Sequence, residues 1–158
     1  PKQYIATVKL GATTETDDPE SSEVVTPSAT AASLDALKAA IATQIGEISQ
    51  MPPVYSALKV AGKRACDRVR AGQTVELQPR LIQIYAIELL DYAWPLATLK
   101  IDCGRGTYVR AIARDIGKLL GVGGYLTELR RTRVGEFDVT EAVRPEELTP
   151  ETVGGRLR

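Results

Sequence analysis

Residues 98–121 read TLKIDCGRGTYVRAIARDIGKLLG, and this stretch contains a strand, a glycine turn and a helix in direct succession. Apolar and polar residues alternate over 99–103, which is the period of a half-buried strand. Apolar residues then recur at helical spacing over 109–120. We expect a helix there, with Thr107 as its N-terminal cap and Gly121 just after its end.

The turn before this helix is a candidate anion site, since a helix N-terminus presents N–H groups without partners. It lacks the Gly-Lys-Ser/Thr ending of a nucleotide-binding P-loop and is too short for a dinucleotide fingerprint, so we expect no ATP or NAD site. The alternative is a turn whose glycines serve geometry alone. Arg110 lies in the first helical turn, where the dipole disfavours a cation, so it requires a carboxylate or phosphate partner. Arg114 and Lys118 follow on the same side and are typical of a solvated basic face.

The remaining sequence alternates between strand and helix patterns without strict βαβ order. The patterns predict strands at 2–10, 56–60, 81–90 and 125–140 and helices at 33–45, capped by Ser33, and 63–71, closed by Gly72. The run 81–90 is apolar on both faces, as in a central strand, whereas two prolines assign 48–55 to an edge strand or an extended loop. Residues 11–33 are typical of a long surface loop. This order indicates an α+β fold with a mixed, mainly antiparallel sheet and flanking helices.

The composition excludes several classes of protein. The chain has 158 residues, of which 44% are hydrophobic and 25% charged, close to the averages of globular domains and against whole-chain disorder. It has no run of about 18 apolar residues and no basic-then-apolar leader, so we expect a cytoplasmic protein without a membrane span. Without histidine, this chain forms neither a Ser-His-Asp triad nor a His-bearing zinc site. Cys66 and Cys103 are too few for a disulfide scaffold.

A net charge of zero hides an uneven distribution. Residues 1–50 carry 3 basic and 7 acidic groups, whereas residues 51–140 carry 14 basic and 9 acidic groups. One basic cluster, Lys59–Arg70, follows Tyr55, and basic residues beside an exposed aromatic ring suit RNA. A second cluster is the Arg-Arg-Thr-Arg run at 130–133, where alternation places the last two arginines on one face of a strand and the first on the other. The alternative for both clusters is a solvated basic surface.

Six blocks occur in order along the chain and resemble one family. They are Lys2-x-Tyr4, Leu10-Gly11 through Thr14-x-Thr16-x-Asp18, Pro52-Pro53-x-Tyr55-Ser56-Ala57-Leu58-Lys59, Gly62-Lys63-Arg64, Gly106-Thr107-Tyr108-Val109-Arg110 and Leu129-Arg130-Arg131. In this order and spacing, the chain resembles the TruB family of tRNA pseudouridine synthases, which isomerise uridine 55 in the T-loop. By this resemblance we expect 1–142 to be the C-terminal part of the catalytic domain and 143–158 to be a polar tail.

The resemblance implies a pseudouridine synthase fold, an RNA cleft, tRNA as partner, and neither cofactor nor metal. Such an enzyme flips its uridine out of the RNA, cuts the N-glycosidic bond, turns the base and rejoins it through carbon. By the matching blocks, we expect Tyr4 to pack on the flipped uracil, Tyr108 to lie against the base and Arg110 to pair with the catalytic aspartate. We expect Leu129 to line the pocket. The residues expected to face RNA are Lys59, Lys63, Arg64, Arg105, Arg130 and Arg131.

One departure from the family bears on activity. The family carries its nucleophilic aspartate in a Gly-His-Thr-Gly-x-Leu-Asp-Pro block upstream of the first matching strand, and these 158 residues contain no such block. We therefore expect this chain to lack both the nucleophile and the anion that Arg110 requires, and to be inactive alone on tRNA. We also expect the absent segment or a second copy of the chain to cover its open sheet edge. Four other carboxylates have the expected roles of surface charge, ion pair or turn cap, namely those of Asp17, Asp18, Asp102 and Asp115.

Three functions stay open at this point. The first is the greater part of a uridine-55 synthase, active when joined to the missing segment. The second is a TruB-like fragment or split-chain subunit that binds RNA without catalysis. The third is an unrelated α+β domain whose basic clusters are a solvated face, and it predicts no salt-dependent binding of tRNA.

Overall fold

The computed structural model describes residues 1–27, 29–60, 62–144 and 146. Its main sheet has six antiparallel strands in the order β10-β9-β1-β8-β7-β4. These strands are β1 (Lys2–Leu10), β4 (Gly46–Gln50), β7 (Arg80–Ala93), β8 (Leu96–Cys103), β9 (Gly124–Val134) and β10 (Phe137–Asp138). Two short ribbons pair β2 (Ala12–Thr13) with β3 (Val24–Val25) and β5 (Lys59–Val60) with β6 (Lys63–Arg64). The helices are α1 (Leu34–Ala42), α2 (Ala65–Arg70), α3 (Val109–Leu119) and the 3-10 turn η1 (Val139–Glu141).

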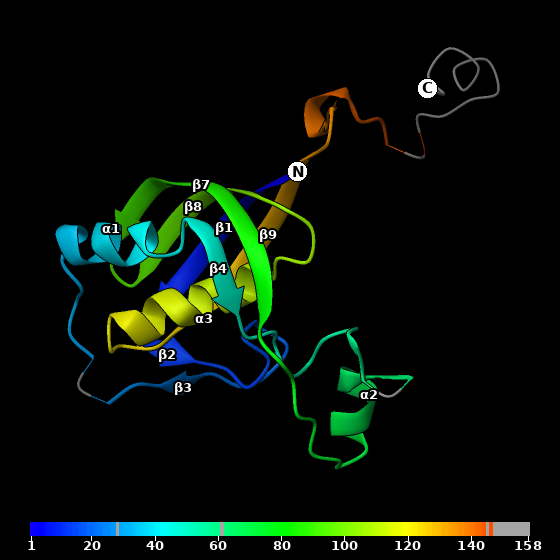
Figure 1. The fold of residues 1–158 in the computed structure, drawn as a ribbon. Coiled ribbons are helices and arrows are strands. Elements are labelled where there is room, and N and C mark those ends of the chain that lie inside the picture. Colours follow the sequence, from blue (N-terminus) through cyan, green and yellow to red (C-terminus); the bar gives the residue numbers. More distant parts are fainter. Residues whose placement is uncertain (28, 61, 145, 147–158) are drawn as a thin grey trace.

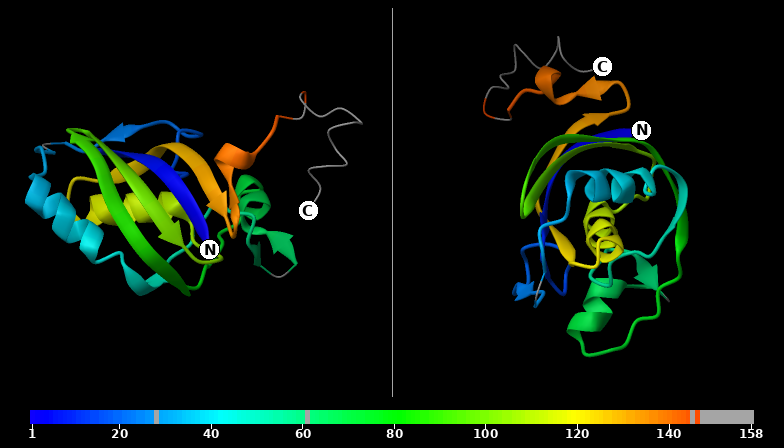
Figure 2. Two further views of the ribbon diagram at one scale, coloured as in Figure 1. Left: turned by 90° about the horizontal axis from the view of Figure 1, so that it is seen from above. Right: turned by 90° about the vertical axis from the view of Figure 1, so that its left-hand side faces the viewer.

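The helices α1 and α3 cover one face of the sheet, and the curved sheet wraps around α3 (Figure 2). The alternation of β1 explains this packing, because Ala6, Val8 and Leu10 are buried on the helix side. Leu99 and Ile101 of the neighbouring β8 join them in the same core. The structure thereby confirms the predicted α+β fold with a mainly antiparallel sheet.

The other face of the sheet has a polar surface. There the side-chain amide of Gln3 donates to the Asp102 carboxylate at 3.2 Å, and Arg133 lies 2.7 Å from the same carboxylate. Lys100 and Glu88 pair on this face at 3.2 Å. An antiparallel sheet commonly packs one face and leaves the other in water, and these cross-strand pairs fit that arrangement.

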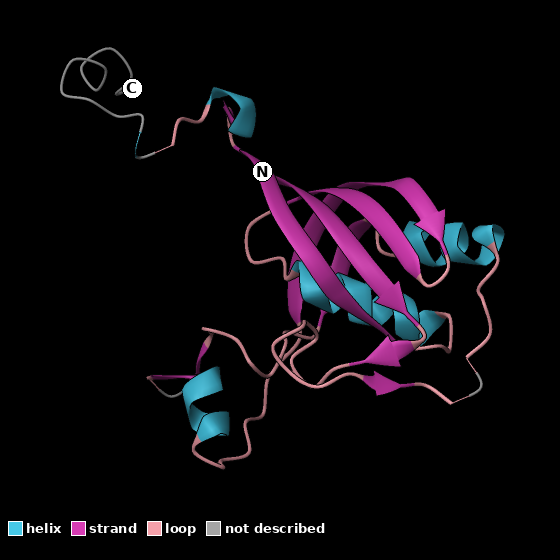
Figure 3. Ribbon diagram, turned by 180° about the vertical axis from the view of Figure 1, so that it is seen from behind, coloured by secondary structure: helices cyan, strands magenta, loops and turns pink. Residues whose placement is uncertain are grey.

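Residues 51–79, which we call the basic arm, stand off the body formed by the sheet and the two longer helices (Figures 1 and 3). The arm leaves at the end of β4 and returns at the start of β7, where Gln50 and Arg80 are paired. Its helix α2 spans six residues and is followed by Gly72, whose φ of +74° ends the helix as predicted. The arm therefore extends from the edge of the sheet and adds no strand to it.

The predicted helix boundaries were partly right. Ser33 caps α1 as expected, since its hydroxyl accepts from the Ala36 N–H at 3.2 Å. The cap of α3 was wrong, because Tyr108 occupies that position and the Thr107 hydroxyl donates back to the Gly104 carbonyl at 3.3 Å. No helix among the residues that the structure describes is long and apolar enough to cross a membrane.

Two other predictions are corrected by burial. The strand at 81–90 is internal to the sheet but is not buried on both faces, since Leu81 is 71% exposed on the solvated face. The stretch 11–33 is not only a surface loop, because Thr14 and Thr16 are buried in it. A polar composition gives no signal for such burial when hydrogen bonds within the loop satisfy the side chains.

Candidate functional site

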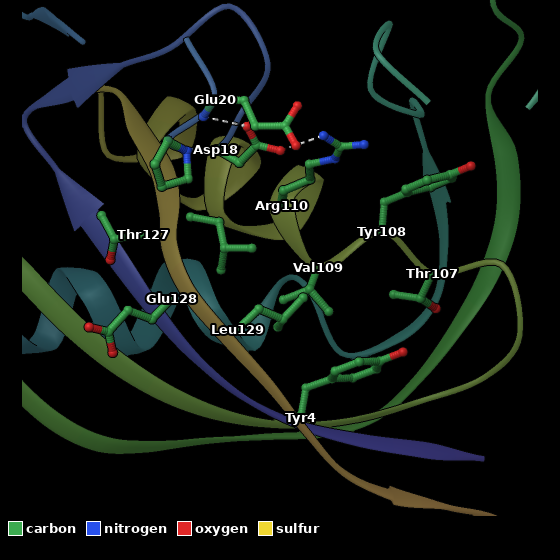
Figure 4. Close-up of a pocket in the computed structure, with 12 residues that line it drawn as sticks. Tyr4, Asp18, Glu20, Thr107, Tyr108, Val109, Arg110, Thr127, Glu128 and Leu129 are labelled. Atoms are coloured by element: carbon green, nitrogen blue, oxygen red, sulfur yellow. Dashed lines mark hydrogen bonds and ion pairs between the residues drawn. The ribbon is translucent and has the colours of Figure 1, made fainter. Parts of the chain in front are cut away.

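A cavity of about 500 Å³ opens between the sheet, the start of α3 and the loop between β2 and β3 (Figure 4). The sheet supplies Tyr4 and residues 126–129, the start of α3 supplies residues 107–110, and the loop supplies residues 18–20. This volume is within the range of clefts that hold small molecules, roughly 300–1,000 Å³. The cavity brings together four residues singled out from the sequence, Tyr4, Tyr108, Arg110 and Leu129.

Arg110 projects from the first turn of α3 along one wall of this cavity (Figure 4). Its Nη1 lies 2.5 Å from Asp18 Oδ2 and donates to the Thr16 carbonyl at 3.2 Å. Its Nη2 donates to the Tyr55 carbonyl at 2.5 Å. The Arg110 and Asp18 side chains are only 20% and 15% exposed, so the ion pair is partly desolvated. The cation at this helix N-terminus thus has the carboxylate partner that the dipole requires.

The expectation that this chain lacks the anion for Arg110 is therefore wrong. Asp18 makes the ion pair and caps its turn at once, since its Oδ1 accepts from the Thr16 hydroxyl at 2.6 Å and from the Glu20 N–H at 3.0 Å. The Thr14 hydroxyl donates to the Asp18 carbonyl at 2.8 Å. The threonines and the aspartate fold the loop onto itself, and this directs the carboxylate toward α3.

Tyr108 is held at the cavity by a residue that the sequence analysis missed. Gln50, at the end of β4, is 2% exposed. Its Oε1 accepts from the Tyr108 N–H at 3.0 Å, and its Nε2 donates to the Tyr108 carbonyl at 3.2 Å. A single glutamine belongs to no periodic pattern, so this contact could not be predicted from the sequence.

Tyr4 and Leu129 form an apolar wall of the cavity (Figure 4). Tyr4 lies on the helix side of β1 together with Ala6, and Ala6 is paired with Leu129 of β9. Leu129 is nevertheless 49% exposed, because it faces the open cavity. A tyrosine ring beside an exposed leucine is suited to contact a flat, weakly polar group such as a nucleobase.

Arg114 lies one helical turn beyond Arg110. Contrary to the prediction of a solvated basic face, its side chain is only 26% exposed. Its Nη1 lies 2.9 Å from Asp17 Oδ2, its Nε lies 2.9 Å from Asp115 Oδ1, and its Nη2 donates to the Met51 carbonyl at 2.8 Å. Burial raises the pKa of Asp17, and the nearby Arg114 guanidinium opposes that rise. The spacing of four residues identified both arginines, but it could not identify Asp17 and Asp18, the carboxylate partners that come from a distant loop.

Those residues expected to face RNA whose side chains the structure describes do not line the cavity. Arg64 is exposed on the basic arm, and Arg105 is exposed in the glycine turn before α3. Arg130 and Arg131 are exposed on β9. The side chains of Lys59 and Lys63 are outside the described residues. Their contacts with RNA stay predictions.

A bulge in β9 places one of its arginines on a different face of the sheet from the one that alternation predicts. The register pairs Tyr4 with Arg131 and Gln3 with Arg133, which makes Thr132 an extra residue on β9. Arg133 is thereby moved to the solvated face, where it meets Asp102, as a partly buried arginine requires. Arg131 is left on the cavity side of the strand. The single extra residue therefore separates Arg133 from Arg131, which strict alternation had placed on one face, and leaves Arg130 opposite Arg131 as predicted.

The site has two chemical features: an apolar wall suited to contact a base, and the Arg110 guanidinium, which can pair with a carboxylate. Its charged lining residues are Arg110, Asp18, Glu20 and Glu128. Within residues 1–27, 29–60, 62–144 and 146, no group of three His, Cys, Asp or Glu side chains is arranged to hold a metal ion. Asp102 lies on the far face of the sheet, so it does not reach Arg110.

The chain matches two family models. One, TruB family pseudouridylate synthase (N terminal domain), matches residues 1–109, and the other, tRNA pseudouridylate synthase B C-terminal domain, matches residues 110–153. tRNA pseudouridine synthase B of Aromatoleum aromaticum is 47% identical over 142 residues, which are 90% of this chain and 46% of the relative. The protein of the same name from Cutibacterium acnes is 49% identical over 145 residues, or 89% of this chain and 49% of the relative. The chain spans about half the length of the curated relatives it matches.

Solved structures share the fold. A chain of the crystal structure of a Cbf5-Nop10-Gar1 complex aligns with a TM-score of 0.66 and 26% identity, covering 93% of this chain and 34% of that chain. A chain of an H/ACA RNP bound to a substrate RNA containing 2'-deoxyuridine aligns with a TM-score of 0.59 and 22% identity, covering 90% of this chain and 31% of that chain.

Proposed function

The chain belongs to the TruB family of pseudouridine synthases, and we propose on that basis that it forms the uridine-binding part of an enzyme that converts uridine 55 of the tRNA T-loop to pseudouridine. The observation that carries the proposal is the cavity itself, where Tyr4, Tyr108, Arg110 and Leu129 come together. A base inside folded RNA must be extruded before its glycosidic bond can be cut, and the extruded base needs a pocket of this kind.

The apolar wall accounts for binding of the base. Tyr4 and Leu129 offer a flat and weakly polar surface on one side, and Tyr108 lines the same cavity from the start of α3. Stacking of a base on an aromatic ring contributes about 1–3 kcal/mol to binding and depends little on which base is stacked. Such a pocket also keeps the base in place after its bond to ribose is broken, when it must turn and not escape.

The reaction exchanges one bond for another. The bond from C1′ of the ribose to N1 of uracil breaks, the base turns, and a bond from C1′ to C5 forms. The proton on C5 is lost and N1 gains a proton, so that the product is an isomer of the substrate. By family resemblance a carboxylate assists this exchange, and Arg110 is the residue that holds it. Described residues take three of the five N–H donors of Arg110, which leaves donors for a second carboxylate.

Asp18 is suited to hold Arg110 and poorly suited to attack the substrate. One of its oxygens is bound to Arg110, and the other accepts from Thr16 and from the Glu20 N–H. A carboxylate with both oxygens occupied is a weak nucleophile, because attack would break those bonds. The attacking group in this proposal is therefore the aspartate of the family's Gly-His-Thr-Gly-x-Leu-Asp-Pro block, which these 158 residues do not contain.

Charge outside the cavity supports binding of the tRNA backbone. The exposed arginines at positions 64, 105, 130 and 131 come from the basic arm, the glycine turn and β9. Contacts of arginine with phosphate release counterions, so affinity should fall linearly with salt on logarithmic axes, with a slope of about −0.7 to −0.9 per phosphate contact. A flat salt dependence would contradict binding of the tRNA backbone by these arginines.

The proposal is tested with tRNA that carries tritium at C5 of its uridines. Three proteins are compared: the chain alone, the chain joined behind the N-terminal part of the Aromatoleum aromaticum relative, and the same fusion with Arg110→Ala. We expect the chain alone to bind tRNA without releasing tritium and the fusion to release it. A fusion that binds tRNA but releases no tritium would contradict the enzymatic function and leave RNA binding without catalysis.

A second substrate tests the position. A tRNA with cytidine in place of uridine 55 should bind the fusion but release no tritium, while other uridines in the molecule remain labelled. Release from this tRNA would show that a different uridine is modified. Release of tritium by the chain alone would show that its own carboxylates suffice, and Asp18→Asn would then identify whether Asp18 is the group responsible.

A further inference from the structure

Arg110 and Arg114 bind neighbouring carboxylates of one loop, the residues 14–23 between β2 and β3. Asp18 lies 2.5 Å from Arg110, and Asp17 lies 2.9 Å from Arg114. Consecutive side chains of an extended chain point in opposite directions. Asp17 has a φ of +61°, and this left-handed conformation turns the backbone so that both carboxylates reach the same side of α3. The strained residue thus allows two adjacent ion pairs one helical turn apart.

The same two arginines also hold the base of the basic arm. Nη2 of Arg114 donates to the Met51 carbonyl at 2.8 Å, and Nη2 of Arg110 donates to the Tyr55 carbonyl at 2.5 Å. The stretch between these carbonyls includes the buried residues Pro52 and Pro53. Proline fixes its own φ and restricts the residue before it, so the position of one carbonyl constrains the other.

Asp17 also connects this network to the wall of the cavity. Its carbonyl accepts from the Leu126 N–H at 3.1 Å, and Leu126 begins the stretch of β9 that lines the cavity. Release of Asp17 from Arg114 would therefore loosen the loop that carries Asp18 and, through Leu126, one attachment of that loop to the sheet. Arg114 itself is not among the residues that line the cavity.

From this arrangement we infer that Arg114 is a positioning residue: through Asp17 and Met51 it holds in place the groups that orient Arg110. This role rests on the proposed function, in which Arg110 holds the reacting carboxylate. A lysine cannot replace it fully, because the planar guanidinium reaches three acceptors in fixed directions, whereas an ammonium is a single point charge. Loss of Arg114 would also leave two partly buried carboxylates, those of Asp17 and Asp115, without their cation.

The first test observes Arg110 directly and needs no RNA. The chain is labelled with nitrogen-15 arginine, and the side-chain Nε–H signal of Arg110, assigned by its loss in Arg110→Lys, is followed by NMR. We expect Arg114→Met to shift and broaden this signal. Lys118→Met, which removes the same charge one turn further along α3 at an exposed position, should leave it unchanged. Equal effects of the two variants would overturn the inference.

Conservative and partner variants separate positioning from folding. Asp17→Asn keeps a residue type that tolerates positive φ and removes only the charge. It should shift and broaden the Arg110 signal as Arg114→Met does, and it replaces Arg114→Met in the test if Arg114→Met fails to fold. Arg114→Lys should restore the signal in part. The double variant Arg114→Met with Asp17→Asn should change the signal no more than the larger single change, and additive changes would show that the two residues act independently.

Turnover in the fusion protein completes the test. Arg114→Met should lower kcat by about 10- to 100-fold with KM within a few fold of the parent, since misplacement of a catalytic group acts on the reacting step. An unchanged kcat together with a perturbed Arg110 signal would overturn the positioning role. If the parent fusion itself has no turnover, the proposed function fails, while the Arg110 signal still decides whether Arg114 sets the position of Arg110.

Discussion

The side-chain amide of Gln50 pairs with both backbone polar groups of Tyr108, as an adjacent strand would. The two residues are 58 apart in sequence, and their hydrogen bonds connect the last residue of β4 to the residue just before α3. The backbone of Tyr108 is extended there, with φ of −100° and ψ of 107°, and its side chain faces the cavity. The position of one cavity tyrosine therefore depends on a buried side chain of the edge strand.

Replacement of Gln50 should destabilise the chain. Gln50→Ala leaves the N–H of Tyr108 without its partner, whereas the Tyr108 carbonyl still accepts from the N–H groups of Ala111 and Ile112. We therefore expect a loss of about 1–3 kcal/mol in the free energy of unfolding by urea. Gln50→Glu can still accept from the N–H, but an ionised glutamate cannot donate to the carbonyl. An ordinary Glu pKa is about 4.3, so the loss in the free energy of unfolding caused by Gln50→Glu should be smaller near pH 4 than at pH 7. Gln73→Ala, at an exposed position of the basic arm, is the control and should change stability by less than about 0.5 kcal/mol.

The pair of Arg110 and Asp18 should affect catalysis more than binding. In the fusion with the upstream part of a relative, Arg110→Ala should reduce turnover by at least about 100-fold while the affinity for tRNA falls only a few fold. Asp18→Asn should reduce turnover less, because Asn keeps the turn and one acceptor for the guanidinium. Tritium release and filter binding on the same preparations provide both values. Equal losses of turnover and affinity for Arg110→Ala would show that it is an RNA contact only.

Local periodicity predicted those parts of the fold that local burial decides. Alternation identified β1 and β8, and the helical spacing of apolar residues identified α3, because each pattern reflects one face packed on the core. Ser33 was predictable for a similar reason, since a hydroxyl before an apolar helical run satisfies the free N–H groups of its first turn. The gathering of the tyrosines and Arg110 around one cavity was expected from the family motifs, and not from any pattern.

Contacts between polar residues far apart in sequence could not be predicted in this way. Arg110 and Asp18 are separated by 92 residues, and nothing in a Thr-, Asp- and Glu-rich loop indicates which carboxylate turns inward. The position of the bulge at Thr132 depends on pairing with β1, so strict alternation placed Arg133 on the same face as Arg131, whereas the register puts the two on opposite faces. Such features follow from the whole chain, whereas a periodic pattern reports one element at a time.

Close packing of α3 against the start of β9 predicts a strong effect of one methyl group. A Cβ built on Gly117 would lie 2.2 Å from the backbone nitrogen of Gly124 and 2.3 Å from the carbonyl carbon of Gly123. Because backbone atoms cannot rotate away, Gly117→Ala must displace the helix, and we expect a loss of about 3 kcal/mol or more in the free energy of unfolding.

Gly104 provides the matched control for this substitution. Its φ is not positive, and a Cβ there would meet its nearest neighbour at 3.4 Å, an ordinary contact. Gly104→Ala should therefore cost less than about 1 kcal/mol in the same urea titration. Similar stabilities of the two variants would mean that α3 and β9 are less closely packed than their backbones indicate.

Tyr125 should make the stability of the chain depend on alkaline pH. This residue is 7% exposed and its hydroxyl donates to Glu23, and burial followed by the nearby carboxylate raises the pKa of Tyr125 from about 10 to about 12. Between these values the unfolded chain loses the phenolic proton before the folded chain does, so the free energy of unfolding should fall as pH rises from about 10 to about 12. Below about pH 10 the phenol is neutral in both states and contributes its full stability.

Substitution isolates this contribution from that of the other tyrosines. Urea unfolding at a series of pH values is compared for the parent chain, Tyr125→Phe and Tyr85→Phe, the last at a position that is 55% exposed. The decline between about pH 10 and 12 should be reduced in Tyr125→Phe and retained in Tyr85→Phe, since only the first removes the buried phenol next to Glu23. The tyrosinate absorbance of the folded chain should lose its highest-pH step in the same variant. If Tyr125→Phe declines as steeply as the parent, the alkaline loss arises from other groups, and the bond between Tyr125 and Glu23 does not control it.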